Sequence, residues 1–80
     1  MNLYKISQDE NDGYDNYDSA VVAAESEEEA IKIHPGSGRL YPDWDSENWV
    51  NDLDLVSVKL IGTAVEGTKP GVILASYNAG

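Results

Sequence analysis

Alternating apolar and polar residues predict four β-strands, two in each half of the chain. In the first of them, Tyr4 and Ile6 are expected on one face, with Lys5 on the other. The second contains two adjacent β-branched valines, and the last two are joined by the turn sequence EGTKPG. The predicted strands cover residues 2–7, 19–25, 55–65 and 72–77.

A short helix is predicted between the second and third strands. Ser26 and Glu29 form the S-x-x-E pattern of a capping box, which places the first helical turn directly after residue 26. Pro35 and Gly36 should end the helix after about two turns. An apolar stripe at i, i+3 and i+4 would face the sheet: Ala30, Ile33 and His34.

Residues 36–54 are polar and rich in turn-forming residues, yet they contain both tryptophans. We expect an ordered loop with one helical turn that Ser46 caps and that contains Trp49 and Val50. At least one tryptophan should belong to the core. The resulting order, ββαββ, predicts an α+β fold: an antiparallel-rich four-stranded sheet with one short helix on a face, forming a single domain over residues 1–80.

Charge limits the classes of partner. The chain has 80 residues, no cysteine and a net charge of −10. Residues 1–54 carry a net −11 and residues 55–80 a net +1, so the negative charge is concentrated in the first two thirds. Phosphate and anionic lipid both require cationic surfaces, so we expect neither direct nucleic-acid nor membrane binding. With no signal-peptide pattern and no long apolar run, a soluble intracellular protein is expected. Its charge either attracts a basic protein surface or serves solubility alone.

No pattern in the sequence predicts a catalytic or metal centre. In the acidic segment QDENDGYDNYD, residues 8–18, an EF-hand register would place Gln8 at the first ligand position and Ser19 at the twelfth, where carboxylates are needed. A weak calcium site stays an alternative to a solvated loop. His34 is the only histidine and is expected to stabilise the helix end as a cation. The GSG at 36–38 leaves a helix, so it lacks the context of a phosphate loop. We therefore expect no enzyme activity and no cofactor.

The acidic surface is the remaining candidate site. Carboxylates spread over a rigid body can imitate a row of phosphates and steer toward a basic groove, while aromatic side chains would anchor the contact. The candidate partner-binding residues are Asp9, Glu10, Asp12, Tyr14, Asp15, Tyr17, Asp18, Glu27, Glu28, Trp44 and Trp49.

Three segments carry a resemblance to a known family: YDSAVVAAESEEEA (17–30), IHP (33–35) and GVILASYNAG (71–80). They resemble a family of small uncharacterised acidic proteins encoded by bacteriophages and prophages, over about half of this chain. The resemblance implies a phage accessory protein acting in the host cytoplasm, and it carries no catalytic residues. Small acidic phage proteins include inhibitors of host defence nucleases, anti-CRISPR proteins among them, and this analogy suggests a nucleic-acid mimic.

Three functions follow as expectations. The first is a non-enzymatic inhibitor that covers a basic, nucleic-acid-binding site on a host protein. The alternative is a structural or assembly module that forms a homodimer through the exposed edge of the last strand, VILASY, which is apolar and uncharged. The third is a weak calcium-binding protein.

Overall fold

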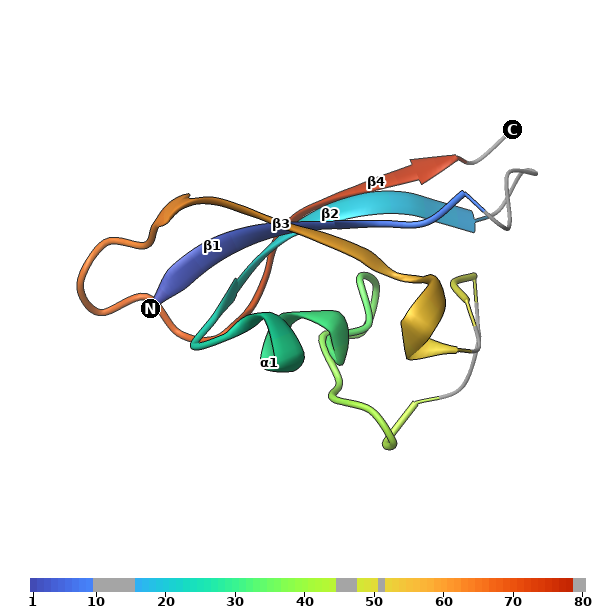
Figure 1. Ribbon diagram of the computed structural model, residues 1–80, viewed down its shortest axis with the longest axis horizontal. Helices are drawn as coiled ribbons and strands as arrows, with labels where there is room; N and C mark the ends of the chain where they lie inside the picture. Colours follow the sequence, from blue (N-terminus) through green and yellow to red (C-terminus); the bar gives the residue numbers. More distant parts are fainter. Residues whose placement is uncertain (10–15, 45–47, 51, 79–80) are drawn as a thin grey trace.

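The computed structural model describes residues 1–9, 16–44, 48–50 and 52–78 (Figure 1). Its four strands form one antiparallel sheet, and one short α-helix and a 3-10 helix lie in the connection between the second and third strands. The expected α+β class is confirmed, although the 3-10 helix η1 adds an element to the expected ββαββ order. The elements are β1 (Asn2–Ser7), β2 (Asn16–Ala24), α1 (Glu27–Ile31), η1 (Leu53–Leu55), β3 (Ser57–Thr63) and β4 (Gly71–Asn78).

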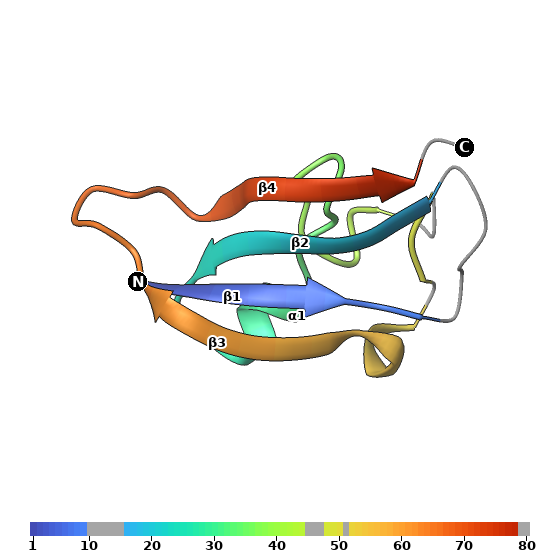
Figure 2. The same ribbon diagram turned by 90° about the horizontal axis from the view of Figure 1, so that it is seen from above.

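The strand order is β3-β1-β2-β4, as seen from above in Figure 2. The antiparallel pair β1–β2 forms the centre, β3 pairs with the outer side of β1, and β4 pairs with the outer side of β2. Consecutive strands β3 and β4 therefore lie at opposite edges, and the chain between them passes the N-terminal end of β1 (Figure 2). There the Ala64 N–H donates a hydrogen bond to the Met1 carbonyl at 3.0 Å.

Within the described ranges, the connecting elements cover one face of the sheet. Figure 1 shows α1 and η1 on the same side of the sheet, with no described element on the opposite side, which we call the open face. Tyr4 and Ile6 are 4% and 0% exposed on the covered face, whereas Lys5 between them is exposed, so the expected alternation of the first strand is confirmed. The largest fully buried side chains are Trp49, Ile6, Ile33, Val22, Val50 and Pro35.

Cross-strand pairing arranges the open face in rows, with one residue from each strand. The row at one end consists of four serines, and the next row contains two lysines followed by two aliphatic residues. Because each row is set by the pairing register, these side chains are neighbours despite their separation in sequence. The rows are Ser57–Ser7–Ser19–Ser76 and Lys59–Lys5–Val21–Leu74.

Helix α1 begins where the capping pattern predicts and ends earlier than expected. Ser26 is the N-cap, and its Oγ accepts a hydrogen bond from the Glu29 N–H at 3.3 Å. The helix ends at Ile31 because the following residues form an extended bridge instead: Ile33 pairs with Leu40, and the Lys32 carbonyl accepts from the Tyr41 N–H at 2.8 Å. Tertiary pairing thus replaces the expected second helical turn.

The helical turn predicted at Trp49 and Val50 is wrong in its position. The structure has a 3-10 turn at Leu53–Leu55 instead, and Asp52 caps it by accepting from the Asp54 N–H at 2.9 Å. Ser46, the expected cap, lies outside the described residues. Strand β2 also begins at residue 16, three residues before the predicted start, because Tyr17 pairs with Tyr77 across the sheet.

Candidate functional site

Acidic side chains accumulate around the two short helices. The first turn of α1 consists of three glutamates, placed there by the Ser26 cap and favoured by the positive end of the helix dipole. Asp52 and Asp54 lie at the start of η1, on the same side of the sheet. We use the name helix-side acids for the exposed carboxylates of α1 and η1 and of the residues directly before these helices. They are Glu25, Glu27, Glu28, Glu29, Asp52 and Asp54.

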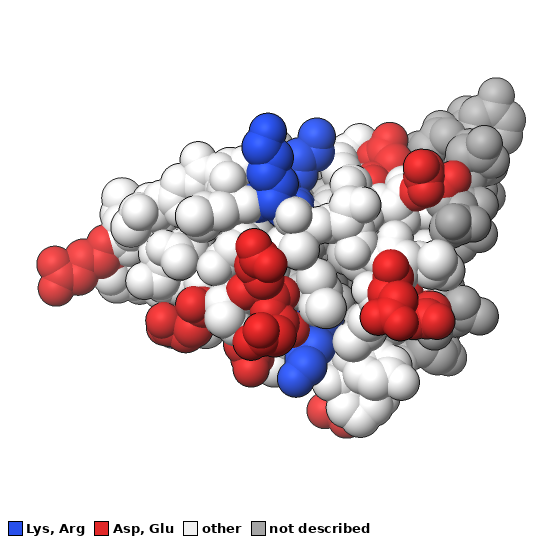
Figure 3. Space-filling model, viewed as in Figure 1, with Lys and Arg blue, Asp and Glu red and all other residues white. Residues whose placement is uncertain are grey.

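Every described carboxylate is exposed to solvent. On the side of the molecule seen in Figure 3, acidic side chains form separate clusters below the sheet and toward its ends, while basic side chains stand at the top, on the open-face side, and another lies among the lower acidic clusters. Exposed carboxylates keep their hydration and their charge, so this surface attracts cations and basic protein patches over a distance of about one Debye length. The ten described acids are Asp9, Asp18, Glu25, Glu27, Glu28, Glu29, Asp43, Asp52, Asp54 and Glu66.

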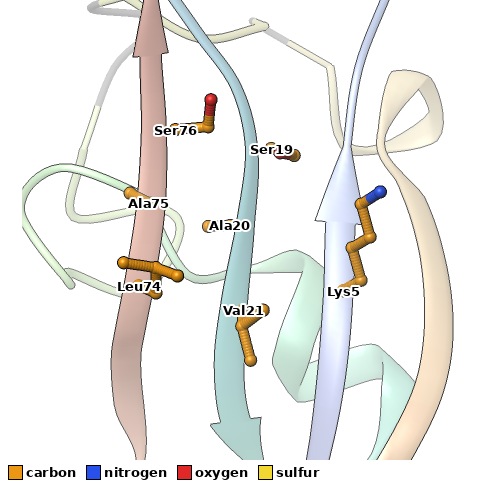
Figure 4. Close-up of a pocket in the computed structure, with 7 residues that line it drawn as sticks. All are labelled: Lys5, Ser19, Ala20, Val21, Leu74, Ala75 and Ser76. Atoms are coloured by element: carbon orange, nitrogen blue, oxygen red, sulfur yellow. The ribbon is translucent and has the colours of Figure 1, made fainter.

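The open face has the opposite character. Lys5 and Lys59 are direct cross-strand partners there, and the two rows of the open face contain no acidic residue. Beside Lys5 is a shallow depression of about 240 Å³, with Ser19, Leu74 and Ser76 among its lining residues (Figure 4). Two like charges placed directly opposite each other repel, so this face does not attract a basic partner.

A cluster of aromatic rings holds the loop after α1 against the end of the sheet. His34 and Tyr17 meet edge to face with ring centroids 6.0 Å apart, and Tyr17 contacts Tyr77 in the same manner at 4.7 Å. On the other side of His34, Trp44 lies at 5.3 Å and Tyr41 lies 5.6 Å from Trp44. Such edge-to-face contacts stabilise by about 0.5–1.5 kcal/mol each beyond their buried area.

His34 lies at the centre of this cluster, and its ring accepts hydrogen bonds from the backbone of the following turn. Its Nδ1 accepts hydrogen bonds from the Gly36 N–H at 3.0 Å and the Ser37 N–H at 3.1 Å, and the side chain is buried. A ring nitrogen that accepts two N–H groups carries no proton, so the expected cationic interaction with the helix end is wrong. Gly36 is required here, because a Cβ at this position would lie 2.6 Å from the Tyr17 hydroxyl oxygen.

The predicted partner-binding residues fall into three groups. Asp9, Asp18, Glu27 and Glu28 are exposed, as a contact residue must be. Four others lie outside the described residues: Glu10, Asp12, Tyr14 and Asp15.

Three of the four predicted aromatic anchors lie within the described residues, and they have structural roles. Trp49 is 1% exposed, so its assignment to the partner-binding surface is wrong and its assignment to the core is confirmed. Trp44 is half-buried, and its Nε1–H donates to the Lys32 carbonyl at 2.7 Å. Tyr17 is also half-buried, within the aromatic cluster. Their amphipathic rings fill the space between the loop and the sheet, which the sequence pattern did not distinguish from a binding role.

Other exposed side chains suit an interface better. Tyr41 and Leu55 are 46% and 38% exposed, and Leu55 lies in η1 next to Asp54. Sequence reasoning missed Asp52, Asp54 and Glu29 as surface acids of the same side. The signal for Asp52 was available, since aspartate is one of the preferred helix-capping residues.

Within the described ranges, no group of three histidine, cysteine, aspartate or glutamate side chains is placed to hold a metal ion. The described part of the chain also contains no helix with the length and apolar character needed to cross a membrane. Comparison with known proteins finds no matching family model, no matching curated protein and no matching solved structure.

Proposed function

We propose that this protein is a non-enzymatic binding protein whose helix-side acids dock onto a basic surface of another protein. The observation that carries the proposal is the unequal charge of the two faces. The six helix-side acids outnumber Lys32 and Arg39 on the covered side, whereas Lys5 lies opposite Lys59 in the open-face rows, which contain no acid. A basic partner is attracted to the first side and repelled by the second, so it approaches in one orientation.

The affinity would come from apolar contacts as well as from charge. Exposed ion pairs contribute only about 0.2–1 kcal/mol each, so the helix-side acids mainly provide orientation and a fast association rate. The apolar anchors are Leu55, next to Asp54 in η1, and Tyr41, whose N–H binds the Lys32 carbonyl just after α1. Both are exposed, and they replace the tryptophans expected from the sequence. His34 has no catalytic part in this proposal, because its Nδ1 is engaged by two backbone N–H groups.

A nucleic-acid-binding protein of a bacterial host is the finer version of the proposed partner. It is supported by the resemblance to phage proteins and by the rule that a basic groove attracts acidic surfaces as it attracts phosphates. On the side seen in Figure 3 the carboxylates form separate clusters, and mimicry of a phosphate backbone stays a prediction. It requires that duplex DNA compete with this protein for the captured partner.

The proposal is tested with two triple variants that each remove three negative charges. The first combines Glu27→Gln, Glu28→Gln and Asp54→Asn; the matched control combines Asp12→Asn, Asp15→Asn and Asp18→Asn in residues 12–18 of the sequence. Immobilised protein is exposed to bacterial lysate at low and at high salt. We expect the parent and the control to retain a basic protein at about 150 mM salt and to release it at about 1 M, whereas the helix-side triple variant retains little at either.

Equal capture by the helix-side triple variant and the parent would show that these acids are not the contact. Loss of capture only in the control would show that the partner contacts residues 12–18 instead. Capture that does not depend on salt would contradict both versions.

A further inference from the structure

Strand β4 is an edge strand that lacks charged and proline residues. Its inner side pairs with β2, and no other described strand pairs with its outer side, which therefore presents backbone N–H and C=O groups. Its sequence, GVILASYN, contains no charged residue and no proline, whereas β1, β2 and β3 contain Lys5, Asp18 and Lys59. Edge strands of monomeric proteins are commonly blunted by such charges or prolines, because a bare edge pairs with other chains.

Apolar side chains are also exposed along this edge. Ile73, Leu74 and Tyr77 are 54%, 69% and 41% exposed, although they belong to regular sheet structure. A register shift between Val72 and Leu74 places Ile73 at a bulge, while residues 74–76 pair with β2 without further interruption on the β4 side. The segment from residue 74 onward is therefore the part of the edge suited to accept another strand.

The charge distribution decides which occupant fits this edge. A basic partner gains nothing from an uncharged strand and is attracted to the helix-side acids instead. Two copies of a chain with net charge −10 repel each other wherever their acids face one another. At β4 they can approach without placing charged residues opposite each other, and the backbone groups of antiparallel strands complement their own copies.

We propose that β4 pairs antiparallel with β4 of a second copy, joining two four-stranded sheets into one continuous sheet with two-fold symmetry. The contact is isologous, since the same residues serve on both sides, and it buries Leu74 and Tyr77 together with the backbone edge. The open faces of the two copies would then adjoin, and the helix-side acids of both would stay accessible. This inference does not depend on the proposed function.

The first test measures mass by sedimentation equilibrium from about 1 µM to 500 µM. We expect the parent to form a dimer. Leu74→Glu places a charge on the β4 edge and should weaken the dimer by roughly tenfold or more. Its matched control is Leu60→Glu, which adds the same charge at an exposed leucine of the other edge strand and should leave the dimer unchanged. Circular dichroism of each variant checks that the sheet is retained.

The second test uses the absence of cysteine in the chain. Ser76 and Ser57 occupy the two ends of the same serine row, one on each edge of the sheet. Residue 76 is the middle of the segment from residue 74 to the end of β4, so a pairing centred on this segment places the two copies of residue 76 opposite each other. Under mild oxidation, Ser76→Cys should then give a disulfide-linked dimer in high yield. Ser57→Cys should give only the low yield of random collision.

Three results would overturn the proposal. A monomer throughout the concentration range excludes the dimer directly. A dimer lost in Leu60→Glu and kept in Leu74→Glu assigns the contact to β3. Equal cross-linking of Ser76→Cys and Ser57→Cys shows that β4 does not form the dimer contact. None of these results bears on capture of a basic partner by the helix-side acids, so the two proposals fail separately.

Discussion

The covered and open faces of the sheet are built from alternate residues of the same four strands, yet they differ in almost every physical property. On the covered face, Ile6 and Val22 are fully buried against Trp49 and the loop after α1. On the open face, Lys5 and Leu74 are exposed to solvent. Hydrophobic burial on the first face provides the folding free energy, which leaves the second face and the helix-side acids available for contacts with other molecules.

The largest expected effect is at the centre of the covered face. Trp49→Ala removes the largest fully buried side chain and leaves a cavity, so we expect a loss of about 3–5 kcal/mol in the free energy of unfolding. The measurement is urea denaturation followed by circular dichroism. Leu74→Ala on the open face is the control, and a comparable loss there would break the distinction between the faces.

A smaller effect is expected at His34, which joins the covering loop to the covered face. His34→Ala removes the acceptor of two backbone N–H groups and part of the aromatic cluster, so the free energy of unfolding should fall by about 2 kcal/mol. His34→Asn should recover part of this loss, because its carbonyl oxygen can occupy the position of Nδ1. Equal thermal midpoints for the two variants would show that ring packing, and not the acceptor, is what matters.

The next effect concerns the cap that starts α1. Ser26→Ala removes the acceptor for the Glu29 N–H and should cost about 1 kcal/mol, measured by thermal denaturation. Ser26→Asp retains an acceptor and is expected to keep most of the stability. The cap also positions the glutamates of α1. The Ala variant should therefore weaken partner capture more than its small loss of stability alone implies.

The smallest effect is expected on the open face itself. Lys5→Ser removes one of two lysines that are direct cross-strand partners and should change the free energy of unfolding by at most about 0.5 kcal/mol. Relief of the repulsion from Lys59 favours slight stabilisation at low salt, and this gain should disappear at high salt. A destabilisation above about 1 kcal/mol would mean that the open face contributes to folding.

The strands could be predicted from the sequence because their period-two pattern reflects a single covered face. Tyr4 and Ile6 alternate with Lys5 for this reason, and Ser26 fixed the start of α1 through local chemistry. The end of α1 could not be predicted, since it depends on pairing between Ile33 and Leu40 across a loop. Trp49 was misassigned because burial of a tryptophan in a polar segment is decided by packing that neighbouring residues do not encode.

The candidate surface was predicted only in part. Glu27 and Glu28 follow from the helix start, but the separation of the acids from Lys5 and Lys59 required the strand register. Lys5 and Lys59 are 54 positions apart in sequence, and only the sheet topology makes them neighbours. Long-range pairing of this kind leaves no local pattern.

The strand order has a consequence for how the chain acquires its structure. The β1–β2 pair involves residues close in sequence and can form early, on the order of microseconds for a hairpin, whereas β3 and β4 must each travel to a different edge. During synthesis the N-terminal half can make the central ribbon, but β2 gains its second neighbour only after residue 78 has been added. In a nascent chain that stops before β4, Ala20 and Val22 would therefore have a neighbouring strand on one side only. The sheet becomes complete when β4 pairs with β2.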